Sequence, residues 1–98
     1  MGQGTLLFRA SLGDVLRAER MRQGMTLREL SSSARVSLGY ISEIERGQKE
    51  ASSELLASLC AALEMPLSTV LHEVADLVAL EESLSGEPAA REVVPSAA

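Results

Sequence analysis

The 98-residue sequence contains one cysteine, one histidine, three prolines and no tryptophan. A single cysteine, Cys60, excludes an intramolecular disulfide framework and a zinc site built from several thiolates. With His72 as the only histidine and no glycine-rich phosphate loop, neither a catalytic triad nor a metal cluster can be assembled. We therefore expect no metal, no cofactor and no enzymatic activity.

Long hydrophobic runs are also absent. No apolar stretch reaches the roughly 18 residues that a membrane span needs, and no basic segment followed by an apolar core opens the chain. We therefore expect a cytoplasmic protein. Apolar residues make up 46% of the chain and aromatic residues only 2%. An aliphatic composition of this kind in a chain of this length predicts one all-α domain.

The net charge of −5 hides an uneven distribution. Residues 1–49 carry eight Lys or Arg against five acids, which gives +3, whereas residues 50–98 carry one Arg against nine acids, which gives −8. A basic half joined to an acidic half favours two surfaces with different partners. The acidic half could also simply be solvated.

Capping residues predict where the first two helices begin. Ser11 and Asp14 have the spacing of a capping box, and Gly24 stands where a glycine would end the helix that Ser11 starts. Thr26 and Glu29 form a second capping box, so a second helix begins at Thr26.

Three further helices follow. Ser37 is a good N-cap for a third helix that Gly47 ends, and Ser52 caps a fourth helix that Met65 and Pro66 break. The remaining segments are a fifth helix over residues 67–84, an N-terminal arm over residues 1–10 and a disordered tail over residues 85–98.

Two helices joined by the short turn at residues 35–37 predict a helix-turn-helix over residues 26–46. Ser31 and Ala34 are small enough for a close helix crossing, and Val36 supplies an apolar plug for the turn. If the second helix turns its isoleucines inward, its free side can enter the DNA major groove, which is about 12 Å wide. That free side carries Leu38, Gly39, Ser42 and Glu43.

Four stretches resemble the XRE family of bacterial and phage repressors. They are residues 12–20 (LGDVLRAER), 25–30 (MTLREL), 36–47 (VSLGYISEIERG) and 59–63 (LCAAL). The resemblance covers residues 11–72 and implies a five-helix, lambda-repressor-like DNA-binding domain. Within this family, residues 33–40 and 48–56 resemble actinobacterial regulators of Clp protease genes.

The resemblance implies a set of DNA contacts. The base-reading positions fall on Leu38, Gly39, Ser42 and Glu43, and Glu43 is the leading reader because a carboxylate accepts from cytosine N4. The DNA backbone and groove edge would be held by Thr26, Arg28, Arg35, Ser37, Tyr40, Arg46 and Lys49. Ser37 is first a helix cap and could fill both roles, and Tyr40 could instead be a core residue at the edge.

The resemblance also implies structural roles. Arg20 and Glu45 match a mostly buried ion pair that joins the first and third helices of the family. Arg35 stands where the family commonly has glycine, so a left-handed backbone there would cost about 1 kcal/mol. We expect a DNA contact by this guanidinium to offset that cost. Cys60 is expected in the core, and His72 is expected to be solvated.

The fifth helix predicts a homodimer. Its apolar positions cover nearly half its circumference, more than packing against its own domain needs. We expect a two-fold interface and a pseudo-palindromic DNA site, with the interface formed by Val70, Val74, Leu77, Leu80 and Leu84. The alternative is that the apolar residues 6–8 fold over this helix.

These patterns predict a sequence-specific transcriptional regulator that binds double-stranded DNA as a homodimer, and the resemblance implies that it controls protease or stress genes. The alternative is a protein-interaction module, such as an antitoxin-like adaptor, that keeps the fold without specific DNA binding. The final Ala97 and Ala98 also resemble a degradation signal for a Clp-type protease.

Overall fold

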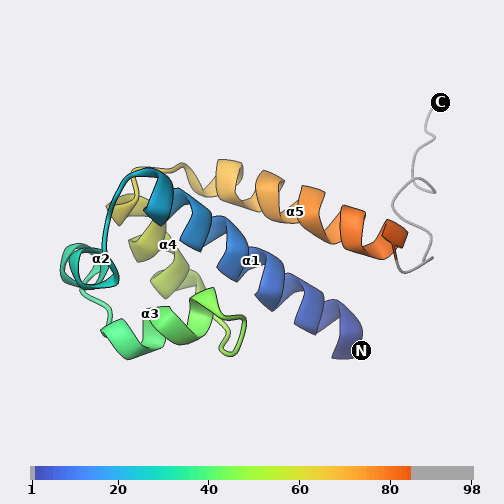
Figure 1. Cartoon of the computed structure of the whole chain (residues 1–98), viewed down its shortest axis with the longest axis horizontal. Coiled ribbons are helices and arrows are strands. Elements are labelled where there is room, and N and C mark those ends of the chain that lie inside the picture. The colour runs from blue at the N-terminus through green and yellow to red at the C-terminus, as the bar shows by residue number, and fades with distance from the viewer. Residues whose placement is uncertain (1, 85–98) are drawn as a thin grey trace.

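The computed structural model describes residues 2–84, and this part of the chain consists of helices and their connections, with no strand. The helices are α1 (Gly2–Arg22), α2 (Leu27–Ala34), α3 (Leu38–Glu45), α4 (Ser53–Ala62) and α5 (Leu67–Leu84) (Figure 1). The predicted five-helix, all-α fold is confirmed. The predicted disordered tail and degradation signal lie outside the described residues.

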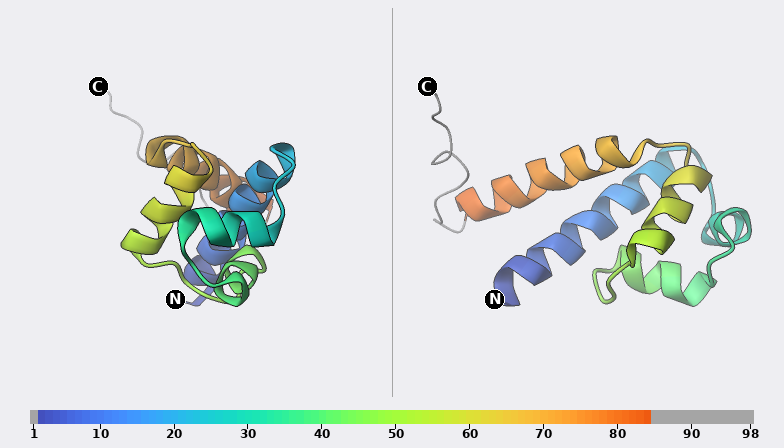
Figure 2. Two further views of the ribbon diagram at one scale, coloured as in Figure 1. Left: turned by 90° about the vertical axis from the view of Figure 1, so that its left-hand side faces the viewer. Right: turned by 180° about the vertical axis from the view of Figure 1, so that it is seen from behind.

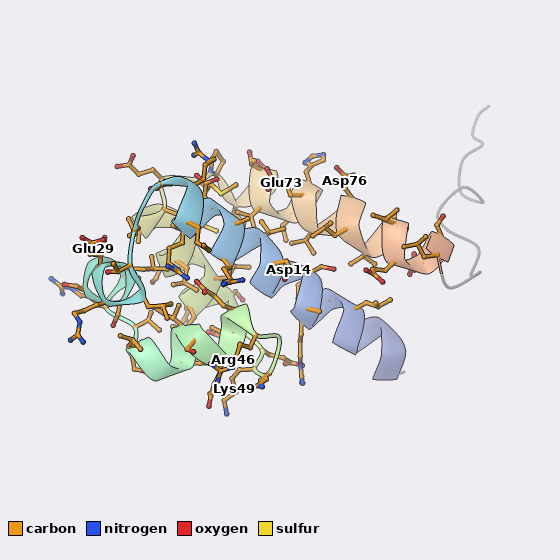
Figure 3. The ribbon with its side chains drawn as sticks, in the orientation of Figure 1. Asp14, Glu29, Arg46, Lys49, Glu73 and Asp76 are labelled. Atoms are coloured by element: carbon orange, nitrogen blue, oxygen red, sulfur yellow. The ribbon has the colours of Figure 1, made fainter. Side chains whose placement is uncertain are left out.

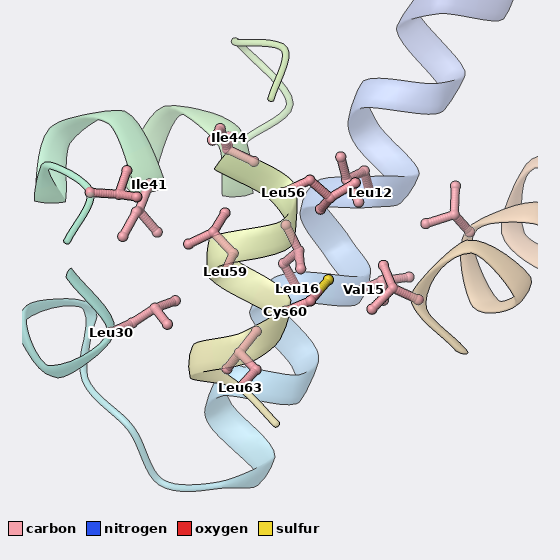
Figure 4. Packing of buried hydrophobic residues seen from close by; sticks show 13 residues of the cluster. Leu12, Val15, Leu16, Leu30, Ile41, Ile44, Leu56, Leu59, Cys60 and Leu63 are labelled. Atoms are coloured by element: carbon pink, nitrogen blue, oxygen red, sulfur yellow. The ribbon is translucent and has the colours of Figure 1, made fainter. Parts of the chain in front are cut away.

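The hydrophobic core forms around α4. Figure 4 shows α4 between the α2–α3 pair on one side and α1 on the other, with Leu59 and Leu63 fully buried. The long helices α1 and α5 lie side by side and antiparallel (Figures 1 and 2). The core contains Leu12, Val15, Leu16, Leu30, Val36, Ile41, Ile44, Leu56, Leu59, Cys60, Leu63, Val70 and Val74.

Local capping signals predict three helix starts correctly. The Thr26 hydroxyl accepts from the Glu29 amide at 3.0 Å while the Glu29 carboxylate accepts from the Thr26 amide at 2.8 Å. The hydroxyls of Ser37 and Ser52 each accept from the amide three residues later, both at 3.2 Å. These caps satisfy amides that a helix start leaves without a partner, and they fix both helices of the helix-turn-helix.

The predicted start of the first helix at Ser11 is wrong, because α1 begins at Gly2. Ser11 is a helix-interior residue that is only 4% exposed. No proline interrupts residues 2–10, and the longer helix gains contact with α5: Phe8 lines an apolar groove with Leu71, Val74 and Val78. The predicted arm over residues 1–10 is therefore helical from residue 2, and Phe8 follows the alternative in which this segment packs against the fifth helix.

Two of the predicted dimer residues belong to the domain's own core. Val70 and Val74 are buried against α1 and α4, so they present no surface to a second copy, and this part of the prediction is wrong. Leu77 is half-buried, whereas Leu80 is 53% and Leu84 74% exposed. The C-terminal half of α5 therefore keeps the apolar surface.

The predicted break at Met65 and Pro66 is confirmed, since α4 ends before it and α5 starts after it at Leu67. In the described residues no single helix is long and apolar enough to cross a membrane. Together α4 and α5 reach that length and composition, as a pair bent by 107° at this break.

Gly13 decides how closely α1 crosses α3. A Cβ at this position would lie 2.4 Å from the carbonyl oxygen of Ile44 and 2.6 Å from that of Glu45. Both contacts are with backbone, which cannot rotate away as a side chain can. Only glycine therefore fits this crossing.

We predict that Gly13→Ala lowers the free energy of unfolding by about 3 kcal/mol, because the added methyl group must push two helices apart. Gly39→Ala is the matched control: Gly39 lies in α3 with no atom within 4 Å of the added Cβ, so stability should stay equal or rise by up to about 1 kcal/mol. Urea denaturation followed by circular dichroism measures both. Equal midpoints for Gly13→Ala and the unsubstituted chain would contradict the close crossing.

Candidate nucleic-acid interface

The turn between α2 and α3 is held by its own backbone and one side chain. The hydroxyl of Ser31 donates to the carbonyl of Val36 at 2.6 Å, and the carbonyl of Ser31 accepts from the amides of Arg35 and Val36. Val36 is buried, as expected for an apolar plug. Arg35 has φ 61° and ψ 43°, so the left-handed backbone expected at this non-glycine residue is present.

The side of α3 that faces away from the core carries the four predicted base-reading residues. Ile41 and Ile44 point into the core and are fully buried. Leu38 and Gly39 are exposed, and Ser42 and Glu43 are half-buried. The structure thus brings these four residues together on one short helical face without large side chains at Gly39 or Ser42.

Exposed cationic side chains precede and follow α3 along the chain. Arg46 and Lys49 are exposed and project together beyond the end of α3, whereas Glu73 and Asp76 project from α5 on the opposite side of the molecule (Figure 3). The Arg46 guanidinium donates to the Ser42 hydroxyl and, at 3.3 Å, to the Gln48 side-chain oxygen. Arg28 and Arg35 are also exposed.

Arg17 is a cationic residue that the sequence analysis did not select. It is exposed on α1 and lines a groove together with Ser42 of α3 and with Arg46, the residue that caps the end of α3. The position of Arg17 could have been inferred from the sequence. Arg17 precedes Arg20 by three residues, so it lies on the same side of the first helix, and this side faces the third helix because Arg20 was predicted to pair with Glu45. Asp14 lines the groove as well.

The predicted ion pair between Arg20 and Glu45 is confirmed. The Arg20 Nε donates to Glu45 Oε2 at 2.7 Å and Nη2 to Oε1 at 2.9 Å, and both side chains are buried. The remaining terminal nitrogen, Nη1, donates to the carbonyl of Met25 at 2.8 Å. The hydrogen bonds to Glu45 raise the pKa of Arg20 above its usual value. The pair thereby joins α1, the α1–α2 turn and α3.

Tyr40 connects α3 to the loop that follows it. Its ring packs against the core, and its hydroxyl donates to the carbonyl of Glu50 at 2.9 Å. The carboxylate of Glu50 accepts from Arg9 Nη2 at 2.8 Å. This arrangement corresponds to the alternative in which Tyr40 is a core residue at the edge of the site.

The remaining titratable candidates lie away from this surface or in the core. Cys60 is buried, and burial raises the pKa of its thiol; the unreactive protonated form is therefore favoured. His72 is exposed on α5. Within residues 2–84 no group of three His, Cys, Asp or Glu side chains could hold a metal ion.

Comparison with known proteins supports the interpretation of α2 and α3 as part of a helix-turn-helix domain. A family model described as a helix-turn-helix domain matches residues 11–77. The transcriptional regulator ClgR of Mycobacterium tuberculosis is 59% identical over 86 residues, which cover 87% of this chain and 77% of the relative. DdrOP3 of Deinococcus deserti, an HTH-type transcriptional regulator, is 32% identical over 59 residues, or 60% of this chain and 46% of the relative.

Solved structures agree with the fold. The clp gene regulator ClgR from Corynebacterium glutamicum is similar with a TM-score of 0.75 and 51% identity, over 80% of this chain and 83% of that protein. The restriction-modification controller protein C.Esp1396I, solved as a tetramer in complex with its 35-base-pair operator, gives a TM-score of 0.68 over 72% of this chain and 93% of its own. At 21% identity this second likeness shows the fold alone.

Proposed function

Since the chain belongs to the helix-turn-helix family, and its relatives named above are transcriptional regulators rather than enzymes, we propose that it regulates transcription by binding a specific duplex DNA sequence as a homodimer. The observation that carries this proposal is the face of α3. Four adjacent positions without bulky side chains at the centre lie between exposed cations, opposite the acidic side of α5.

In this proposal α3 enters the major groove and reads bases. Gly39 and Ser42 allow the helix backbone to approach the base edges, and Leu38 meets a thymine methyl group. Glu43 accepts a hydrogen bond from cytosine N4 and is the principal reader. Specificity therefore depends on one carboxylate and on close apolar contact.

The DNA backbone is held around this helix. Arginine and lysine side chains neutralise phosphates, and the amides at the starts of α2 and α3 point toward them. The proposed backbone contacts are Thr26, Arg28, Arg35, Ser37, Arg46 and Lys49, with Arg17 added and Tyr40 at the groove edge. Since the hydroxyls of Thr26 and Ser37 already cap helices and the Thr26 amide donates to Glu29, we expect these two residues to contribute mainly by fixing where the two helices start.

The similarity to ClgR over 87% of the chain supports a narrower proposal. The relative from Corynebacterium glutamicum is described as a clp gene regulator, and we propose that this chain also controls Clp protease genes. Because the proposed partner is DNA, we also propose that this activity lies in the cytoplasm.

The dimer is proposed to form through the outer face of α5. Leu77, Leu80 and Leu84 have helical i, i+3 and i+7 spacing, so they share one stripe, and the last two are largely exposed. A second copy related by two-fold symmetry would bury this stripe and pair two copies of α3 across successive turns of DNA.

Selection of bound duplexes from a random DNA library at about physiological salt tests the proposed function. We expect a two-fold symmetric consensus with half-sites about 10 base pairs apart. Glu43→Gln should relax the preference at one position of each half-site, by about 1–3 kcal/mol, because the amide no longer discriminates for cytosine. No enrichment from a folded protein would instead support a protein-interaction module.

We predict that Arg35→Gly makes the domain more stable and its DNA binding weaker. Glycine tolerates the left-handed backbone at this position, so the free energy of unfolding should rise by about 1 kcal/mol. Loss of the guanidinium should weaken DNA binding because it removes a phosphate contact. Fluorescence anisotropy with the selected duplex measures the affinity. A variant that is more stable and binds equally well would exclude a DNA role for Arg35.

We predict that the double substitution Leu80→Glu and Leu84→Glu produces a folded monomer, because like charges would then oppose each other in the two-fold interface. Sedimentation equilibrium should show half the mass of the unsubstituted protein. Met21→Glu is the control, since Met21 is an exposed apolar residue of α1 and should leave the mass unchanged. Equal masses for the double variant and the unsubstituted protein would rule out this face.

A further inference from the structure

The N-terminal half of α1 contacts the loop at residues 46–52, which connects α3 to α4. The Arg9 guanidinium forms an ion pair with the carboxylate of Glu50 at 2.8 Å. Three residues before Glu50, a Cβ at Gly47 would lie 3.1 Å from the Cα of Ala10. The backbones of α1 and the loop therefore nearly touch at this point. The helix therefore meets this loop on both sides of Lys49.

The two halves of the loop are anchored differently. The first half continues from α3 through backbone hydrogen bonds, from the Gln48 amide to Glu43 at 2.8 Å and from the Gly47 amide to Ile44 at 3.0 Å. In the second half, Glu50 accepts from Tyr40 through its carbonyl and from Arg9 through its carboxylate. Lys49 lies between these anchors, with its side chain exposed.

The Arg9–Glu50 pair contributes little to folding stability. The two side chains are 30% and 62% exposed, and ion pairs in water gain little because solvent screens them. The Arg9 Nε is buried, and it finds no hydrogen-bond acceptor within the described part of the chain, which is unfavourable for stability. The main effect of the pair is therefore on the position of the loop rather than on the stability of the domain.

We propose that Arg9 is a positioning residue for DNA binding: through Glu50 it holds the loop so that Lys49 meets a DNA phosphate. This inference rests on the proposed function. A loop fixed before binding loses less conformational entropy when Lys49 becomes ordered on the DNA. Arg9 itself, engaged by Glu50, makes no contact with the duplex.

The experiment measures affinity for the selected duplex as a function of salt for Arg9→Met, Glu50→Ala and their controls. Arg9→Met keeps the apolar stem, and we expect about three- to fivefold weaker binding with an unchanged melting temperature. The matched control is Arg22→Met, which removes the same charge from an arginine paired with Glu19 within α1 and should change affinity less. Arg9→Lys, which retains a cation for Glu50, should recover most of the loss.

Glu50→Ala provides the decisive comparison. Removal of an acid close to DNA should by itself strengthen binding, so a loss similar to that of Arg9→Met is expected only if the pair positions the loop. In a Lys49→Gln background, Arg9→Met should have no further effect, because the contact that it positions is already gone.

Three results would overturn the proposal: equal affinity of Arg9→Met and Arg22→Met, tighter binding by Glu50→Ala, or a full effect of Arg9→Met in the Lys49→Gln background. The third would mean that Arg9 acts independently of Lys49, as a direct contact of Arg9 with a phosphate would. Any of these leaves DNA binding by the unsubstituted chain intact. If the unsubstituted chain itself retains no duplex, the proposed function fails together with this assignment.

Discussion

The buried pair of Arg20 and Glu45 is the interaction on which the proposed DNA-binding surface depends. It is two-pronged, and a third donor of the same guanidinium binds the carbonyl of Met25. One guanidinium thus fixes the rotation of α3 relative to both α1 and the turn before α2. Removing one partner would leave a buried charge unpaired, which typically costs about 3–5 kcal/mol, a large part of the stability of a small domain.

The crossing of α1 and α3, which the ion pair joins, also requires a residue without a side chain at position 13. The pair can close at these distances because Gly13 lets the backbone of α3 approach α1. The approach continues along α1 to Ala10, which nearly touches Gly47 in the following loop. Thus α1 supports α3 and then the loop that follows it, by a close backbone crossing, a buried ion pair and an exposed one. This arrangement explains why a helix that carries none of the predicted base readers influences how they are presented.

Charge is separated in space as well as along the chain. A net charge of −5 by itself disfavours binding to a polyanion, because the average potential repels phosphate. The fold resolves the conflict by placing Arg46 and Lys49 at the end of α3 and Glu73 and Asp76 on the far side of α5 (Figure 3). These two carboxylates of α5 are thereby farther from a duplex on α3 than Arg46 and Lys49 are.

The sequence by itself determined the helices that local interactions start, because the caps at Thr26, Ser37 and Ser52 act within three residues. It also indicated the Arg20–Glu45 pair, through family resemblance rather than spacing. Only the tertiary structure decided where α1 begins and which residues of α5 are buried. Ser11 has a similar local signal, yet packing of α1 against α5 continues the helix past it, and the same packing takes Val70 and Val74 into the core. Contacts between residues more than 60 positions apart, such as Phe8 and Leu71, outweigh such signals, and no local pattern records them.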